Sequence, residues 1–242
     1  VSGRGVERLR EAGIQVITGV MEKEARELNE AFMTFQTKER PFVTLKWAES
    51  ADGFIDYKRM ENGQPRLFIS NPITRMRSHK LRAESAAILV GTHTALWDNP
   101  SLTTRYWAGA SPVRMAIDLD LKIPKSFHLL DGSTPTLIFT TCCEGRIGNT
   151  EYVLLDLGES VVEQIMQVLR HRKLNSLIVE GGANMLQQFI DAGCWDRAVV
   201  EKSTQEIGMG VRAPILLNGT AKIEQFGGHA FIEYRRGSEY LT

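Results

Sequence analysis

The chain has 242 residues, and its 29 lysines and arginines balance its 29 aspartates and glutamates. This length fits one large domain or two small ones. A net charge near zero argues against the basic surface that binding to nucleic acid or to an anionic membrane requires. No apolar run reaches the length of a membrane span, and no signal-peptide pattern opens the chain. We therefore expect a cytoplasmic protein that binds neither nucleic acid nor a membrane.

The cysteines and histidines form no metal-binding pattern. Cys142, Cys143 and Cys194 are an odd number with one adjacent pair, which makes a poor disulfide framework and suits a reducing compartment. No second pair lies at ligand spacing, and the histidines are scattered along the chain. We therefore predict no metal site and assign no histidine to catalysis.

Helices and strands are predicted to alternate along the chain. Residues 22–35 carry apolar side chains at helical spacing and predict a helical connector. A helix is predicted over 72–83, where Asn71 can cap the first turn and Pro72 suits it. Another is predicted over 160–172, which has one apolar face. The predicted strands are 41–48, 86–91, 113–118, 136–141, 152–157, 176–179 and 197–202.

The last part of the chain predicts an antiparallel hairpin. Residues 223–226 and 230–234 have strand character, and Gly227-Gly228 can turn between them. The alternation upstream predicts an α/β fold with a mainly parallel central sheet flanked by helices. No Gly-x-Gly-x-x-Gly motif follows the first strand, so a Rossmann fold is not expected. Two stretches are predicted as loops: 119–135 and 203–225.

The most informative segment is a predicted strand that ends in a carboxylate and two glycines. An apolar run over 177–179 leads to Glu180, Gly181 and Gly182, and an amphipathic stretch over 183–192 follows. Glycines at such a turn let backbone N–H groups approach a ligand, and the following helix N-terminus suits a phosphate. The competing interpretation is a tight strand-to-helix turn with a solvated glutamate.

Two earlier segments have a similar form. Residues 41–48 alternate as on a strand and lead to a turn signal at Asp52-Gly53. Residues 88–91 predict a buried strand, and a hydroxyl-rich turn and a short helical piece follow it. This piece stops before Pro100, because the residue before a proline avoids the helical region.

Six short motifs keep their order over roughly residues 40–215. They are Lys46…Ser50-Ala51-Asp52-Gly53, Ile69-Ser70-Asn71-Pro72, Leu81-Arg82-Ala83-Glu84-Ser85, residues 94–105, Val179-Glu180-Gly181-Gly182 and Gly210-Val211-Arg212-Ala213-Pro214. With these motifs the chain resembles the reductase domain of the bifunctional riboflavin-biosynthesis deaminase-reductase. Each motif is weak alone, but six in order form a specific signal. The resemblance implies a dihydrofolate-reductase-like fold.

The first forty residues extend this resemblance. Residues 3–14 are similar to the closing helix and strand of the family's deaminase domain, whose zinc motifs this sequence lacks. Any zinc would therefore belong to the absent deaminase domain. We expect residues 1–39 to be a remnant of that domain plus a helical connector, and residues 40–242 to form the reductase domain.

The resemblance implies NADPH-dependent reduction of the ribose of 5-amino-6-(5-phosphoribosylamino)uracil to a ribityl chain. The hydride would go to the sugar C1′, in either an open-chain aldehyde or an imine form. Because the nicotinamide carries the hydride, the protein must bind and orient the cofactor and the substrate, and polarise the bond that is reduced. The implied partner is a phosphorylated pyrimidine, and the family's assemblies imply a homodimer or a higher homo-oligomer.

The resemblance assigns substrate binding to Arg82, Leu102, Arg105 and Glu180, with both arginines on the 5′-phosphate. Guanidinium forks match phosphate oxygens. Without the resemblance, Arg82 would be a cation near a helix C-terminus and Arg105 a loop charge. Lys46 and Glu180 are the expected catalytic residues, with Lys46 stabilising charge that develops on the sugar oxygen. The competing interpretation of Lys46 is an exposed side chain on an edge strand.

Cofactor contacts are implied at Ala48, Phe68, Thr94, Asp98, Gly182, Ala183, Asn184, Met185, Leu186, Gln187 and Gln188. Thr94 could equally cap a helix, and Asp98 could begin a turn. Segment 58–68 is longer and more basic than the family pattern. It places Arg66 where the family has a substrate-binding serine, so the role of Arg66 stays open.

Two other functions compete with the reductase. One is a dihydrofolate-reductase-like enzyme for a pterin or a related heterocycle, which would not need a substrate phosphate. The other is a non-catalytic domain that binds nucleotide or mediates oligomerisation. Because Arg82, Arg105 and Glu180 are all present, the sequence favours the reductase of riboflavin synthesis.

Overall fold

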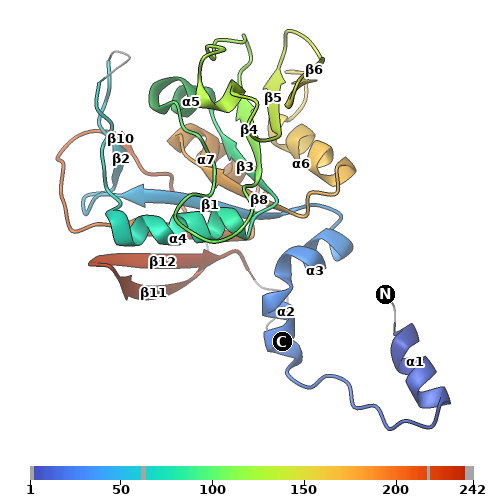
Figure 1. Cartoon of the computed structure of the whole chain (residues 1–242). Helices are drawn as coiled ribbons and strands as arrows, with labels where there is room; N and C mark the ends of the chain where they lie inside the picture. Colours follow the sequence, from blue (N-terminus) through green and yellow to red (C-terminus); the bar gives the residue numbers. More distant parts are fainter. Residues whose placement is uncertain (1–2, 61–63, 217–218, 238–242) are drawn as a thin grey trace.

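A central sheet organises the molecule (Figure 1). The computed structural model describes residues 3–60, 64–216 and 219–237, and ten strands of this part form the sheet. In spatial order they are β11 (Thr220–Phe226), β12 (His229–Arg235), β9 (Arg197–Lys202), β1 (Phe42–Glu49), β8 (Ser176–Glu180), β3 (Ala87–Val90), β4 (Val113–Ile117), β5 (Thr136–Thr140), β7 (Thr150–Leu154) and β6 (Gly145–Ile147).

The strand directions confirm the predicted fold class. All the pairs from β9 through β7 are parallel. β12 pairs antiparallel with both β9 and β11, and β6 pairs antiparallel with β7. The predicted terminal hairpin turns at Gly227 and Gly228, whose φ angles of +60° and +84° lie in the left-handed region that favours glycine.

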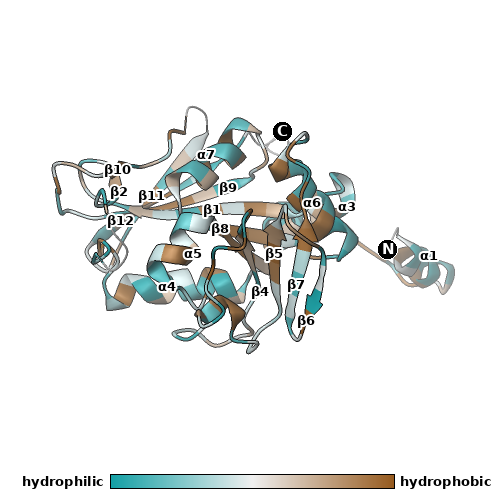
Figure 2. Cartoon of the chain, turned by 90° about the horizontal axis from the view of Figure 1, so that it is seen from above, coloured by the Kyte–Doolittle hydropathy of each residue, from teal (hydrophilic) through white to brown (hydrophobic). Residues whose placement is uncertain are grey.

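Helices cover both faces of the sheet, and two clusters of buried side chains fill the space beneath them. On one face, two helices pack against Leu45 and Val179. On the other, two helices pack against Ile88 and Ile178. The first pair is α6 (Val161–His171) and α7 (Ala183–Asp191), and the second is α4 (Pro72–Ala83) and α5 (Thr92–Asp98). Figure 2 shows α7 and α4 on opposite sides of β1.

The start of α4 follows the prediction. The Asn71 side chain accepts hydrogen bonds from the backbone N–H groups of Ile73 and Thr74, at 2.9 and 3.0 Å. The Thr74 hydroxyl in turn accepts from the Asn71 N–H, which completes a capping box. Pro72 occupies the first turn, where its missing N–H costs nothing. These caps hold in place the helix that carries Arg82.

Other boundaries differ from the prediction. β7 spans 150–154 instead of 152–157. The short strands β2 (Phe54–Asp56), β6 and β10 (Val211–Arg212) were not predicted, because such short segments hold no alternating pattern. The predicted loop over 203–225 contains β10 and the start of β11, whose residues are all exposed and carry no apolar stripe. The predicted loop over 119–135 contains the 3₁₀ turn η1 (His128–Leu130).

The chain before the sheet forms three short helices. The predicted connector divides at Asn29 into α2 (Glu22–Leu28) and α3 (Glu30–Thr37). α1 (Arg4–Glu11) buries no side chain and lies apart from the sheet (Figure 1). The division of the chain near residue 39 stays a prediction. Within the described part of the chain, no helix has the length and apolar character to cross a membrane.

Arg114 is a buried cation on β4. It donates to Thr136 Oγ1 at 3.0 Å, to His128 O at 2.6 Å and to Asp131 Oδ1 at 2.9 Å. Arg114→Met should lower the free energy of unfolding by about 3 kcal/mol, because these acceptors lose a charged donor inside the fold. Denaturant titration measures the loss. The exposed control Arg146→Met should change it by less than about 0.5 kcal/mol, and equal losses in both variants would contradict the expectation.

Candidate functional site

A cavity of about 780 Å³ lies at the carboxyl ends of β1, β3 and β8, beside α4, α5 and the start of α7. Ligands of open α/β sheets bind at this edge. Most of the predicted site residues line it: Lys46, Ala48, Phe68, Arg82, Thr94, Asp98, Leu102, Arg105, Glu180, Gly182, Ala183 and Asn184. The structure thus brings together stretches that are far apart in the sequence, and Arg105 and Glu180 line the same cavity.

Glu180, at the end of β8, forms a two-pronged ion pair with Arg82 of α4. Arg82 Nε donates to Glu180 Oε1 at 2.9 Å, and Arg82 Nη2 donates to Oε2 at 2.5 Å. Burial alone would raise the pKa of Glu180, but the charge and hydrogen bonds of Arg82 outweigh burial and lower it. Glu180 is therefore ionised. Arg82 also donates to Thr103 O at 3.2 Å, which leaves it fewer donors for a phosphate than the sequence indicated.

Lys46 lies between two carboxylates on one face of the sheet. It is the direct neighbour of Glu180 in the β1–β8 ladder. On β9 its neighbour is Val199, and Glu201 comes two residues later on the same face. Burial alone would raise the pKa of both carboxyl groups, and Lys46 is among the groups that lower them. Among the described residues, nothing hydrogen-bonds or ion-pairs with the Lys46 ammonium, which leaves its donors available to a ligand in the cavity.

Glu201 is a buried residue that the sequence did not single out. Its side chain is 0% exposed. Ser70 Oγ donates to Oε2 at 2.5 Å, and His229 Nδ1 lies 2.7 Å from Oε1. Ser70 belongs, with Phe68, to the segment that lines the cavity. Glu201 therefore ties this wall of the cavity to β9 and to the hairpin. A lone acidic residue inside an apolar strand was its only signal in the sequence.

The loop after α5 forms part of the cavity wall. Leu102 is buried with a φ of +54°, which costs a residue other than glycine about 1–3 kcal/mol. Arg105 donates from its guanidinium to Ser101 Oγ at 3.1 Å and from its backbone N–H to His79 Nδ1 at 3.0 Å. No carboxylate in the described part of the chain forms an ion pair with Arg105. Its charge is therefore available to an anion in the cavity.

The turn between β8 and α7 also lines the cavity. Gly181 and Gly182 have φ angles of +97° and +73°. A Cβ on Gly181 would lie 3.2 Å from Thr94 Cγ2, and one on Gly182 would lie 3.5 Å from Thr94 Oγ1. Among the described residues no side chain caps α7, so the first N–H groups of the helix keep their donors for a ligand. An unpaired helix N-terminus at a cavity suits a phosphate.

The next four residues of α7 do not line the cavity. Met185 and Leu186 pack into the core beneath the helix. The Gln187 side chain donates to Asp191, and the Gln188 side chain donates to Asn184. None of these four side chains is among those that line the cavity, so the cofactor contacts predicted for them stay predictions.

Arg59 belongs to the segment that departs from the family pattern, and the sequence did not identify it as a site residue. Its guanidinium lies 2.5 Å from an Asp56 oxygen, 2.8 Å from an Asp98 oxygen and 5.0 Å from the centre of the Trp97 ring. The side chain is 8% exposed. The contact with Asp98 has ion-pair distance without hydrogen-bond alignment, and Nε has no partner among the described residues. Asp98, predicted to contact a cofactor ribose, thus has a cationic neighbour.

The glycine turn yields a testable prediction. Gly182→Ala should weaken binding of the predicted cofactor NADPH about tenfold or more, because a Cβ at a φ of +73° strains the turn beside the N–H donors of α7. Fluorescence titration measures the dissociation constant. Gly132→Ala is the matched control, since Gly132 has a φ of +72° and open space around its Cβ position. Both variants should lose similar thermal stability, and equal NADPH affinity in both would contradict a cofactor role for this turn.

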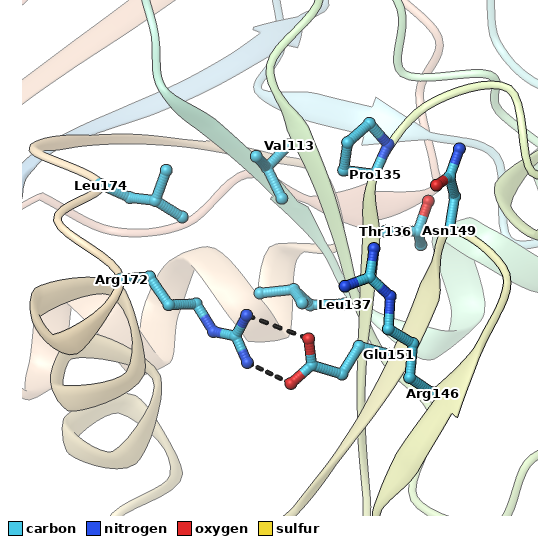
Figure 3. A pocket seen from close by; sticks show the side chains of 9 residues that line it. All are labelled: Val113, Pro135, Thr136, Leu137, Arg146, Asn149, Glu151, Arg172 and Leu174. Atoms are coloured by element: carbon cyan, nitrogen blue, oxygen red, sulfur yellow. Dashed lines mark hydrogen bonds and ion pairs between the residues drawn. The ribbon is translucent and has the colours of Figure 1, made fainter.

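A smaller cavity of about 200 Å³ lies at the amino ends of β4 and β5 (Figure 3). There Arg172 forms a two-pronged ion pair with Glu151, and Arg146 lies beside them. Its volume is below the roughly 300–1,000 Å³ that ligand sites occupy, and the Glu151 carboxylate offsets the arginine charge. The larger cavity is therefore the candidate active site.

Comparisons with known proteins agree with this geometry. A family model described as the RibD C-terminal domain matches residues 41–212. The riboflavin biosynthesis protein RibD of Aquifex aeolicus is 37% identical over 216 residues, which are 87% of this chain and 60% of that protein. RibD of Bacillus amyloliquefaciens is 36% identical over 90% of this chain and 60% of its own length. The chain thus spans about 60% of these relatives.

A solved structure from Thermotoga maritima matches with a TM-score of 0.83 and 33% sequence identity, over 96% of this chain and 66% of that one. Its title describes a diaminohydroxyphosphoribosylaminopyrimidine deaminase/5-amino-6-(5-phosphoribosylamino)uracil reductase. These findings confirm the resemblance that the six sequence motifs indicated. The chain therefore belongs to the RibD C-terminal domain family of riboflavin biosynthesis.

Proposed function

We propose that this chain reduces the ribose of 5-amino-6-(5-phosphoribosylamino)uracil to a ribityl chain, with NADPH as the hydride donor. One observation carries the proposal: Lys46 and Glu180 lie in the same cavity as the Arg105 guanidinium and the Gly181-Gly182 turn. A phosphorylated sugar and a dinucleotide both need an anion-binding group, and the cavity has one for each. The Thermotoga maritima relative is described as a reductase of this compound.

The residues at the glycine turn fit a nicotinamide dinucleotide. Gly181 and Gly182 allow close approach of the backbone, and the uncapped N-terminus of α7 offers N–H donors to the pyrophosphate. Ala48 leaves room in the cavity wall for a flat ring. When bound, the reduced nicotinamide supplies the hydride. The choice of NADPH over NADH, like the homo-oligomeric assembly and the deaminase remnant over 1–39, is carried by the family resemblance.

At the substrate end, Arg105 binds the 5′-phosphate with its planar fork of donors. Arg82 adds a second positive charge nearby and holds Glu180 in place. Ionised Glu180 accepts hydrogen bonds from the N–H groups of the pyrimidine or the hydroxyls of the sugar. The strained backbone at Leu102 presents this loop to the cavity.

Lys46 acts on the heteroatom that is bonded to the reacting carbon. In the open-chain form the bond between C1′ and the ring oxygen has broken, that oxygen carries a proton, and C1′ forms an imine with the amine nitrogen. As the hydride adds to C1′, the π bond between C1′ and nitrogen breaks, and its electron pair moves to that nitrogen heteroatom. The Lys46 ammonium stabilises the resulting charge and gives the heteroatom its proton. A preorganised donor of this kind contributes about 10²–10³-fold to a rate. Glu180 beside it orients the sugar for transfer.

The test is oxidation of NADPH by the purified chain. We expect turnover with the phosphorylated ribosylaminouracil, a much lower kcat/KM with its dephosphorylated form and none with dihydrofolate. Turnover of dihydrofolate would favour a pterin reductase instead. Binding of NADPH without oxidation under any of these conditions would favour a non-catalytic domain. The same assay with NADH in place of NADPH tests the cofactor preference.

A further inference from the structure

His79 is a histidine that the proposed chemistry does not use. It lies on α4 one turn before Arg82, is 2% exposed and lines the cavity with Arg82 and Arg105. Its ring meets the Tyr106 ring edge to face, with 4.8 Å between centroids and 85° between planes. A buried histidine at a site built from arginines needs a physical reason, because it displaces an apolar side chain from the helix interface.

The reason lies in its hydrogen bond. The Arg105 backbone N–H donates to His79 Nδ1 at 3.0 Å. A backbone N–H is always a donor, so Nδ1 must be unprotonated and the ring proton sits on Nε2. The imidazole is therefore neutral and acts as an acceptor for the amide of the residue that we assign to the substrate phosphate.

Burial and the surrounding arginines keep the ring neutral. Arg82 and Arg75 face it from its own helix, Arg105 from the loop, and Glu180 from β8. Burial and then Arg82 are the main causes that lower its pKa, Glu180 opposes them, and the resulting pKa is about 4. At neutral pH the ring thus adds no charge and keeps its acceptor.

The loop that carries Arg105 depends on such side-chain anchors. Residues 99–105 form no strand or helix of their own. The loop is held by hydrogen bonds from Arg82 to Thr103 O at 3.2 Å and from Thr104 N–H to Ser111 Oγ at 3.1 Å. His79 is the anchor that bonds to the Arg105 backbone itself, and so it sets where the guanidinium begins.

We propose that His79 is a positioning residue for substrate-phosphate recognition: its neutral Nδ1 holds the Arg105 backbone so that the guanidinium meets the phosphate. This inference rests on the proposed function, because it assumes that Arg105 binds the substrate phosphate. His79 touches neither the hydride nor the reacting carbon, so its effect belongs in KM for the phosphorylated substrate and not in kcat.

Two variants of similar size distinguish the effect of losing the hydrogen-bond acceptor from the effect of altered packing. In His79→Asn the amide oxygen can take the place of Nδ1, whereas in His79→Gln the amide reaches toward the place of Nε2 and leaves the Arg105 N–H unpaired. We expect His79→Asn to keep KM for the phosphorylated substrate within about threefold, and His79→Gln to raise it about tenfold. Neither variant should change the NADPH dissociation constant or the kcat/KM of the dephosphorylated substrate.

A double-mutant cycle tests the route of the effect. If His79 acts through Arg105, then His79→Gln in an Arg105→Ala background should raise KM no further. Additive effects, equal behaviour of the Asn and Gln variants, or equal losses for the dephosphorylated substrate would each overturn the proposal. If His79→Gln fails to fold, His79→Phe takes its place in the test. Phenylalanine keeps the ring contact with Tyr106 but lacks the acceptor, so this variant should show the same rise in KM.

Binding of ribose 5-phosphate tests the role of His79 independently of the proposed function. Its binding to each variant, followed by nuclear magnetic resonance, needs no turnover. If the wild-type chain fails to oxidise NADPH, the proposed function fails. A weaker ribose 5-phosphate affinity in His79→Gln, with His79→Asn like wild type, would still support the role of His79. Equal affinity in wild type and both variants would overturn it.

The neutral ring also has a stability signature. Its pKa falls from an ordinary 6.5 to about 4 on folding, so the native state binds fewer protons than the unfolded state between these values. His79 should therefore stabilise the fold above about pH 6.5, and this contribution should be lost as the pH falls toward 4. Thermal denaturation across this range should show a smaller loss in His79→Asn, and identical profiles would contradict a neutral buried imidazole.

Discussion

Lys46→Met is expected to lower kcat for NADPH oxidation about 10²–10³-fold, the size of effect seen when one preorganised donor at a developing charge is removed. Methionine keeps the length and apolar stem of lysine, so the strand and the cavity wall should be retained. The lost ammonium, which lies beside Glu180 in the strand register, can no longer stabilise charge on the heteroatom at C1′. Steady-state kinetics at saturating substrate and cofactor measure the change.

Lys202→Met is the matched control for this substitution. Lys202 is also a strand lysine, on the neighbouring β9, but it pairs with Glu49 and lies outside the cavity. Its kcat should stay within about twofold of wild type, because a surface ion pair contributes at most about 1 kcal/mol, and to folding only. A kcat for Lys46→Met within tenfold of wild type would contradict the assignment of Lys46 to the chemical step.

Arg105→Ala is expected to raise the apparent KM for the phosphorylated pyrimidine about 10²-fold, while the KM for NADPH changes by less than about threefold. A charged hydrogen bond to a phosphate contributes about 1.5–3 kcal/mol, which corresponds to roughly 10–150-fold. The structure supports this asymmetry, because no described carboxylate neutralises Arg105, and the N–H donors that we expect to hold the cofactor belong to a different element, the start of α7. Initial-rate kinetics with each substrate varied in turn measure both constants.

The dephosphorylated substrate is the control for Arg105. Wild type and Arg105→Ala should use it with the same kcat/KM, because no phosphate is present for the guanidinium to bind. Arg105→Lys should recover part of the affinity through its charge but not the two-pronged geometry. An equal rise in the KM for NADPH, or a loss that persists without the phosphate, would show that Arg105 supports the fold and not the phosphate.

The elements that could be predicted from the sequence are those with a strong local signal. Asn71-Pro72 specified the start of α4 through capping geometry, and Gly227-Gly228 specified the hairpin turn. The long buried strands were recognised because apolar runs leave a clear pattern. β6 and β10 were missed because two or three exposed residues leave none, and β10 in addition pairs with β2, which lies far away in the sequence.

The site residues that belong to sequence motifs could be predicted. The contacts between their side chains could not. Lys46, Arg105 and Glu180 were identified from the sequence, and all three line one cavity. The ion pair of Arg82 with Glu180 depends on how α4 lies over β8, which no local pattern encodes. His79 had one usable signal, its position three residues before Arg82, which places both on one face of a helix.

Arg59 shows a different limit. The sequence marked segment 58–68 as basic and unlike the family pattern, but the residue singled out was Arg66. Arg66 lies over the Phe68 ring at 4.7 Å, whereas Arg59 reaches Asp98 and Trp97 on α5. Both arginines line the cavity, but only the positions of Asp56 and Asp98 in the fold decide that Arg59 is the one that forms the ion pairs. Those partners are known only once the strands and helices are in place.

Hydride transfer to the sugar is the central claim, and an isotope tracer tests it most directly. The chain would be incubated with the phosphorylated ribosylaminouracil and with NADPH deuterated at the transferable hydrogen of the nicotinamide, and the product examined by mass spectrometry and nuclear magnetic resonance. We predict one deuterium per product molecule, located at C1′ of the ribityl chain. Product without deuterium, or deuterium on the pyrimidine ring, would contradict the account.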